Sequence, residues 1–134
     1  MHRHQTKQRT TLGGAGAVGM VYVIGSVDEF AVEFGVDGGD VTVRVTGEVD
    51  LATAGALAVE LNRAVEDFGG VVTVNLASVT FFDLTALRAL LVARSALDAR
   101  GRLLVVADPA MVATRVFELT DQLHVFQPSN HADT

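Results

Sequence analysis

The sequence predicts an α/β domain in which one mixed sheet of four to five strands packs against about three helices. Two patterns lead to this expectation. Apolar residues alternate with polar ones in several short segments, as in strands, and recur every three or four positions in longer segments, as in helices. From residue 28 onward these segments follow the order β-β-α-β-α-β-α, with glycine, proline and aspartate between them. Residues 28–134 are therefore expected to form a single domain.

The first two strands are expected to pair as a hairpin. Apolar side chains alternate along 30–34 and again along 41–46, so each strand has one face suited to burial. The DGGD sequence at 37–40 predicts a tight turn between them, because glycine adopts positive φ angles without steric cost. An antiparallel pair therefore opens the domain.

The segment 53–68 is predicted to be an amphipathic helix that ends at a pair of glycines. Its polar positions Glu60, Arg63 and Asp67 are expected to face water. The residues expected on its buried face are Ala54, Leu57, Leu61, Ala64, Val65 and Phe68.

The apolar run at 71–76 predicts the third strand. Because both of its faces are apolar, we expect it to be central and parallel to a neighbour. A Leu-rich helix over 84–99 follows, with Asp83 as its N-cap, since a carboxylate can accept hydrogen bonds from the free N–H groups of the first turn. The residues expected on the buried stripe of this helix are Leu84, Leu87, Leu90, Leu91 and Leu97.

Residues 102–107 predict the fourth strand. Asp108 and Pro109 are then expected as the N-cap and first residue of a third helix that runs to about residue 119. A fifth strand, if present, would lie near 124–126.

Residues 1–27 are expected to be a flexible arm outside the domain. The first eleven are polar and basic, and 12–25 are apolar and rich in glycine. A secretory signal peptide is the alternative, but no clear cleavage site follows. The sequence GAGAVG at 14–19 matches a dinucleotide-binding pattern without the preceding strand and following helix that give this pattern its meaning.

The composition excludes several classes of function. All sixteen acidic residues but only seven of the ten basic ones lie at 28–134, and the resulting charge of −9 would repel phosphate backbones. The absence of cysteine excludes disulfides, thiolate nucleophiles and Cys-based zinc sites. The four histidines (His2, His4, His124 and His131) have no metal-binding spacing, so we expect no metal and no cofactor. The apolar N-terminal stretch is too short to span a membrane. We therefore expect no nucleic-acid or membrane partner and a cytoplasmic location.

The clearest candidate site is the junction between the third strand and the second helix. Thr85 would lie in the first helical turn with its hydroxyl exposed, where the helix dipole and unpaired amides favour an added negative charge. A phosphate there would add about −1.5 to −2 charges, held by Arg88 at i, i+3 and repelled by Asp83. Asp50 is expected at the same sheet edge, because parallel strands end together. The alternatives are that Asp50 is only a turn or capping residue and that Thr85 is merely tolerated in the first turn.

Four stretches of the chain, in order, resemble the STAS family and, within it, the bacterial anti-sigma-factor antagonists. They are GEVDLATAGAL at 47–57, VVTVNLASVTFFDLTALRALL at 71–91, GRLLVVADP at 101–109 and VFELT at 116–120. The resemblance implies a STAS-like domain that binds a cognate anti-sigma factor, often a serine/threonine kinase, and so frees a sigma factor for transcription.

The resemblance also implies which residues form the site. In this family the kinase phosphorylates a hydroxyl within an Asp-Ser-Ser-Gly-Leu sequence, and a phosphatase removes the phosphate. Here Thr85 is the implied phosphoacceptor, and leucine and alanine replace the family's first serine and its glycine. Asp50 corresponds to the aspartate of the family's G-x-x-D-L sequence. The implied partner-binding residues are Asp50, Asp83, Leu84, Ala86, Leu87 and Arg88.

Two other functions stay open at this point. The first keeps the fold but places the chain in a lipid-transport or stress-signalling complex. The second is a small hydrolase or nucleotide-binding enzyme. Thr85 has no neighbouring histidine to act as a base, and nothing in the sequence sets the separation of Asp50 and Asp83 as an acid–base pair, so catalysis is the less favoured interpretation.

Overall fold

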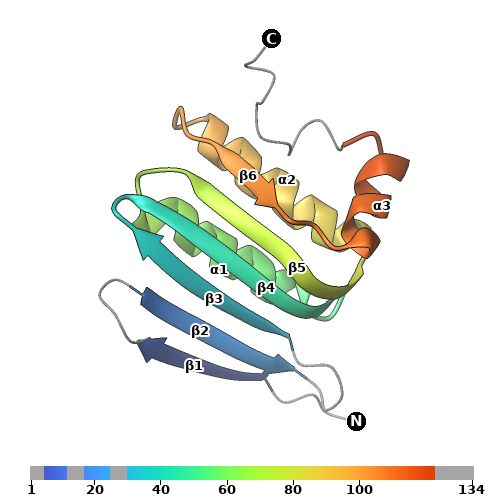
Figure 1. Ribbon diagram of the computed structural model, residues 1–134, viewed down its shortest axis with the longest axis horizontal. Helices are drawn as coiled ribbons and strands as arrows, with labels where there is room; N and C mark the ends of the chain where they lie inside the picture. Colours follow the sequence, from blue (N-terminus) through green and yellow to red (C-terminus); the bar gives the residue numbers. More distant parts are fainter. Residues whose placement is uncertain (1–4, 12–16, 25–29, 123–134) are drawn as a thin grey trace.

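The computed structural model describes residues 5–11, 17–24 and 30–122, with side chains described from residue 30 onward. Within these residues six strands form one mixed sheet in the order β1-β2-β3-β4-β5-β6 (Figure 1). Strands β1 to β4 pair antiparallel, whereas β4, β5 and β6 pair in parallel. The strands are β1 (Gln5–Thr11), β2 (Ala17–Ile24), β3 (Ala31–Asp37), β4 (Asp40–Val49), β5 (Val72–Phe82) and β6 (Leu104–Ala107).

Three helices lie in the described part of the chain. Helices α1 (Ala54–Asp67) and α2 (Leu84–Asp98) lie together on one face of the sheet, and α3 (Met111–Leu119) lies beside the end of β5 (Figure 1). Each parallel strand pair is therefore connected through one helix, β4 to β5 through α1 and β5 to β6 through α2. From β3 to α3 the order is β-β-α-β-α-β-α, as predicted from the sequence.

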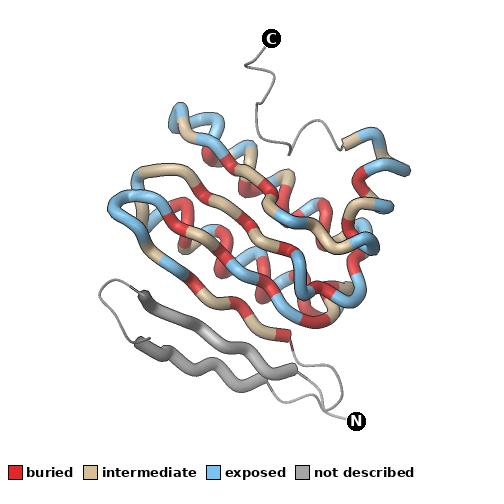
Figure 2. The backbone as a smooth tube through the Cα atoms, viewed as in Figure 1, coloured by how far each residue is buried: buried red, intermediate tan, exposed pale blue. Residues whose placement is uncertain are grey.

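The hydrophobic core lies between the sheet and the helices. Alternate residues of β4 are buried throughout its length, because successive side chains of a strand point to opposite faces (Figure 2). Leu57 of α1 and Leu90 of α2 close the core and are fully buried. Helix α3 joins through Phe117, whose ring meets Phe82 edge-on with 5.5 Å between the ring centroids.

Most predicted elements are confirmed with small shifts at their ends. The hairpin between β3 and β4 turns at Gly38, which has a φ of 64°. Strand β5 is central and parallel to both neighbours, as its apolar faces predicted, but it continues to Phe82. The fifth strand considered near 124–126 lies outside the described residues.

The sheet is wider than predicted because two segments of the expected N-terminal arm are strands. In β2, Ala17 pairs with Gly35 and Met20 pairs with Val32 of β3, and β1 pairs with β2. Without them the outer edge of β3 would present unpaired N–H and C=O groups, a condition that favours an added strand. The domain boundary expected at residue 28 thus falls between β2 and β3, which are paired strands of the same sheet.

Two helical side chains differ from the prediction in their burial. Glu60, expected in water, is fully buried in α1, and its carboxylate Oε1 lies 3.8 Å from Nε of Arg63. It falls within the apolar stripe of α1, one turn from Leu57. Leu84, expected on the buried stripe of α2, is exposed. At about 100° per residue, Leu84 is about 120° around the helix from Leu90, so it points away from the stripe.

Helix α3 begins two residues later than predicted. Ala110 is its N-cap, so Asp108 does not cap the helix and Pro109 is not its first residue. Asp108 has a φ of 47°, and the chain turns there before the N–H of Ala110 donates to the carbonyl of Leu76 at 3.2 Å. Docking onto β5 therefore decides where this helix starts.

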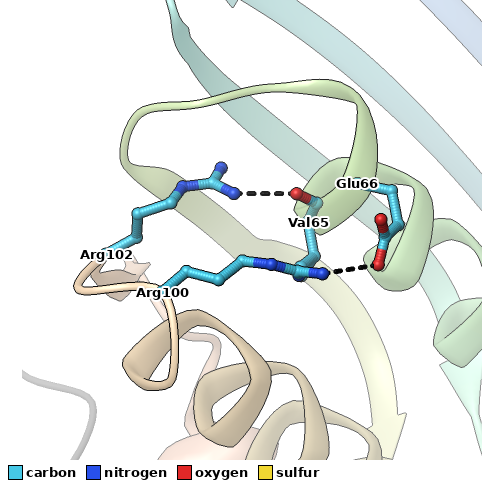
Figure 3. Close-up of polar contacts among 4 residues, drawn as sticks. All are labelled: Val65, Glu66, Arg100 and Arg102. Atoms are coloured by element: carbon cyan, nitrogen blue, oxygen red, sulfur yellow. Dashed lines mark hydrogen bonds and ion pairs between the residues drawn. The ribbon is translucent and has the colours of Figure 1, made fainter.

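Two arginines connect the end of α1 to the segment between α2 and β6 (Figure 3). Arg102 donates from Nη1 to the carbonyl of Val65 at 2.7 Å and from Nε to the carbonyl of Gly70 at 2.9 Å. Arg100 makes an ion pair with Glu66 at 2.8 Å, and both side chains are exposed. The carbonyl of Val65 lies in the last turn of α1, where carbonyls lack an intrahelical partner. Arg102 therefore satisfies a polar group at the helix end.

Candidate functional site

The candidate site is built where β4 and β5 end side by side. In the parallel register Val49 is opposite Phe82, and each strand passes directly into a helix. The first residue after each strand is an aspartate, Asp50 after β4 and Asp83 after β5. The two loops that sequence reasoning expected at one sheet edge are therefore neighbours.

Asp83 is the N-cap of α2, as predicted. Its carboxylate Oδ1 accepts hydrogen bonds from the backbone N–H of Thr85 at 2.9 Å and of Ala86 at 3.1 Å. These are two of the first-turn donors that a helix leaves without an intrahelical partner. The cap thus holds the beginning of α2 in a defined conformation.

Thr85 lies in the first turn of α2 and is half-buried. Its hydroxyl donates a hydrogen bond to Oδ1 of Asp83 with an oxygen–oxygen distance of 2.5 Å. The hydroxyl therefore lies at the N-terminus of α2, where the helix dipole favours negative charge, and beside a carboxylate that does not. This is a site where an added phosphate would change the local charge balance.

Asp50 organises the other loop by the same means. Its Oδ1 accepts from the N–H of Ala52 at 2.9 Å and of Thr53 at 3.2 Å. The hydroxyl of Thr53 lies 3.3 Å from the same oxygen and also donates to the carbonyl of Glu48 at 2.8 Å. Asp50 is thus a turn residue, the alternative that the sequence left open, and its place beside the Asp83 loop makes it part of the candidate site as well.

The other residues predicted for partner binding divide into two groups. Leu84 and Arg88 are exposed and available to a partner. Ala86 and Leu87 are buried, with at most 4 % of either exposed. They can only support the surface from within, and their part in partner binding stays a prediction.

Sequence reasoning missed Leu51 and Phe81, which are both exposed at this edge. For Leu51 a signal was present as a repeated pair of residues: Asp-Leu begins the β4–α1 loop, and Asp-Leu forms the N-cap and first residue of α2. In each pair the aspartate accepts hydrogen bonds from backbone N–H groups of its own loop or helix start, and the leucine that follows it lies on the surface.

No cluster of three or more His, Asp or Glu side chains suited to a metal occurs among the described residues. The four histidines considered for metal binding lie outside that part of the chain. None of the helices described is long and apolar enough to cross a membrane.

The model of the STAS-domain family matches residues 31–134, which is most of the chain. The chain belongs to the STAS-domain family. The match begins with β3 and includes both aspartate loops, so the candidate site lies inside the STAS domain. A sequence comparison with curated proteins gave no match.

Solved structures similar to this STAS domain include anti-sigma-factor antagonists. One from Mycobacterium paratuberculosis is 25 % identical, with a TM-score of 0.63 over 78 % of this chain and 90 % of that chain. SpoIIAA in its unphosphorylated form is 18 % identical, with a TM-score of 0.61 over 74 % of this chain and 85 % of that chain. The Bacillus cell fate determinant SpoIIAA in its phosphorylated form is 19 % identical, with a TM-score of 0.58 over 74 % of this chain and 88 % of that chain. The likeness to SpoIIAA is one of fold.

Proposed function

We propose that this protein is an anti-sigma-factor antagonist. It binds a cognate anti-sigma factor in the cytoplasm through the adjoining loops at Asp50 and Asp83 and the start of α2, and it thereby releases a sigma factor. It acts by binding and not by catalysis. The observation that carries the proposal is the hydroxyl of the half-buried Thr85 at the N-terminus of α2, in a STAS domain whose fold resembles an antagonist solved in phosphorylated and unphosphorylated forms.

Thr85 is the proposed phosphoacceptor, modified by a serine/threonine kinase and restored by a phosphatase. A phosphate on Thr85 would carry about −1.5 to −2 charges. It would replace the hydroxyl hydrogen that now contacts Oδ1 of Asp83, so the phosphate and the Asp83 carboxylate, both anionic, would face each other at the proposed binding surface. Repulsion from Asp83 would shift the first turn of α2, and desolvating the phosphate would cost free energy, so binding would weaken.

Affinity capture with the full-length protein in the cells that encode it tests the function. We expect the wild type to recover an anti-sigma factor, identified by mass spectrometry, and intact mass to report phosphate on the bait. Recovery of a transport ATPase or a large signalling complex in its place would favour the alternative assignment to such an assembly. Turnover of a nucleotide or ester that is lost in Asp50→Ala or Asp83→Ala would favour an enzyme.

The phosphorylation switch has a separate test with the purified anti-sigma factor. We expect Thr85→Val to bind like the wild type, because valine keeps the shape of threonine, and Thr85→Glu to bind at least tenfold more weakly. Ser95→Glu, which adds the same charge at an exposed position near the other end of α2, is the control and should bind normally. Equal affinity of wild type and Thr85→Glu would contradict the switch.

A further inference from the structure

The two loops of the site share one local design. In each, an aspartate directly follows the strand and turns its carboxylate onto the backbone N–H groups two and three residues later. The residue after each aspartate is a leucine, Leu51 in one loop and Leu84 in the other. These leucines are 80 % and 63 % exposed. Local hydrogen bonds thus hold both loops in place while the leucines stay in solvent.

The register of β4 and β5 brings these leucines to one edge of the sheet. Val49 and Phe82 are opposite each other in the parallel ladder, and each leucine comes two residues after its strand ends. Phe81, which is 46 % exposed, is opposite Glu48 just before that point. A single exposed leucine is ordinary, but three large apolar side chains at adjoining strand ends are typical of an interaction site.

Within the two strand–helix junctions the charged side chains are all acidic. The segments 47–54 and 79–87 contain Glu48, Asp50 and Asp83 and no lysine or arginine. The first cation on either helix at this edge is Arg88, one turn into α2. An acidic border disfavours an acidic partner and attracts a basic one. The apolar side chains and their acidic border together indicate that a complementary partner surface is apolar and bordered by basic side chains.

We propose that Leu51, Phe81 and Leu84, here called the apolar edge, are the central contact for the anti-sigma factor, which meets them with apolar side chains bordered by lysine or arginine. This inference rests on the proposed function and adds to it the residues that determine affinity. Because the aspartates hold both loops before binding, little conformational freedom is lost on contact. Such rigid, central apolar side chains are the kind that dominate an interface.

Exposed leucines elsewhere on the molecule supply matched controls. Leu119, at the end of α3, is 82 % exposed and matches Leu51. Leu103 is 61 % exposed and matches Leu84. Its carbonyl accepts from the N–H of Val72 at the start of β5, so it lies at the opposite end of the sheet from the apolar edge.

The anti-sigma factor recovered by affinity capture is first purified. Calorimetry then measures its binding to the full-length protein. We expect Leu51→Ser and Leu84→Ser each to raise Kd at least tenfold and the double variant to raise it further. Leu103→Ser and Leu119→Ser should stay within twofold of the wild type. The wild-type Kd should rise as NaCl is increased from 50 to 500 mM. Circular dichroism of each variant confirms that it is folded.

Several results would overturn the inference. If the anti-sigma factor bound Leu51→Ser and Leu84→Ser as tightly as the wild type, the apolar edge would not be its central contact. The proposed function would still stand. Binding that does not weaken with salt would contradict a basic partner surface. A wild-type dimer that the two serine variants convert to monomer, measured by sedimentation, would assign this edge to a second copy of the chain. Failure to recover any anti-sigma factor would remove both proposals.

Discussion

The hydroxyl of Thr85 donates to the same carboxylate oxygen of Asp83 that accepts the backbone N–H groups of Thr85 and Ala86. One oxygen atom therefore serves both as the cap of α2 and as the partner of the proposed phosphoacceptor. A phosphate on Thr85 would compete with Asp83 for those two N–H groups and repel its carboxylate. Modification of this hydroxyl is consequently coupled to the stability of the first turn of α2.

Removal of the cap should destabilise the protein. Asp83→Ala leaves two first-turn N–H groups and the Thr85 hydroxyl without their acceptor, and loss of an N-cap costs about 0.5–2 kcal/mol. Urea unfolding followed by circular dichroism measures the change in free energy of unfolding. Asp83→Asn keeps an accepting oxygen and should lose less. A free energy of unfolding unchanged in Asp83→Ala would show that the cap contributes nothing.

A negative charge at position 85 should interact unfavourably with Asp83. We expect Thr85→Glu to destabilise the protein more in the wild-type background than in Asp83→Asn, with a coupling of about 0.5–1 kcal/mol, typical of groups in direct contact. A double-mutant cycle of unfolding free energies measures this coupling. It should shrink in 1 M NaCl, because salt screens exposed charges. A coupling of zero at low salt would contradict the competition described above.

Leu84 and Leu87 should differ sharply when truncated. Leu87 is buried, and Leu→Ala at such a site costs about 2–5 kcal/mol through lost burial and the cavity that remains. Leu84 is exposed, so Leu84→Ala should change the free energy of unfolding by less than about 0.5 kcal/mol. The same urea experiment compares them. Similar losses in both variants would mean that Leu84 belongs to the core after all.

The two glycines after α1 offer another matched pair. A Cβ on Gly70 would lie 2.8 Å from the carbonyl oxygen of Gly39 and closer still to the carboxylate of Asp40, whereas a Cβ on Gly69 would meet nothing within 4 Å. Gly70→Ala should therefore cost about 1–3 kcal/mol, the range for a forced overlap. Gly69→Ala should leave stability nearly unchanged. Equal midpoints in thermal unfolding would contradict this difference.

Arg100 and Arg102 should contribute unequally to stability. Arg102→Ala leaves the carbonyls of Val65 and Gly70 without a charged donor and should cost about 1–3 kcal/mol. The ion pair of Arg100 with Glu66 is exposed, so Arg100→Ala should cost at most about 1 kcal/mol. Unfolding free energies in urea rank the two variants. The reverse order would contradict the larger contribution expected of Arg102, whose contact with Val65 is drawn in Figure 3.

Elements whose signals are local in the chain could be predicted from the sequence. The hairpin turn at Gly38, the apolar character of β5 and the cap at Asp83 each depend on residues within a few positions of one another. The same holds for the proposed phosphoacceptor, because Thr85 lies two residues after the cap. The nearness of Asp50 could also be inferred, since parallel strands that each lead into a helix end at one edge.

Other features were not predicted, because they depend on what an element packs against. Glu60 has the spacing of its apolar neighbours and is buried with them, although its charge suggested solvent. Leu84 is as apolar as Leu87 but is exposed, because it is about 120° around α2 from Leu90. The start of α3 is set by its hydrogen bond to β5. The pairing of β2 with β3 depends on the otherwise unpaired edge of β3.

The sequence by itself determined the order of the elements from β3 to α3, the capping of α2 and the position of the hydroxyl within its first turn, because short-range hydrogen bonding and side-chain periodicity specify them. Only the tertiary structure decided which leucines face solvent and which residues of β4 and β5 are opposite one another. Exposure is set by the surrounding elements, and the neighbour of a residue across a parallel ladder is distant in the chain.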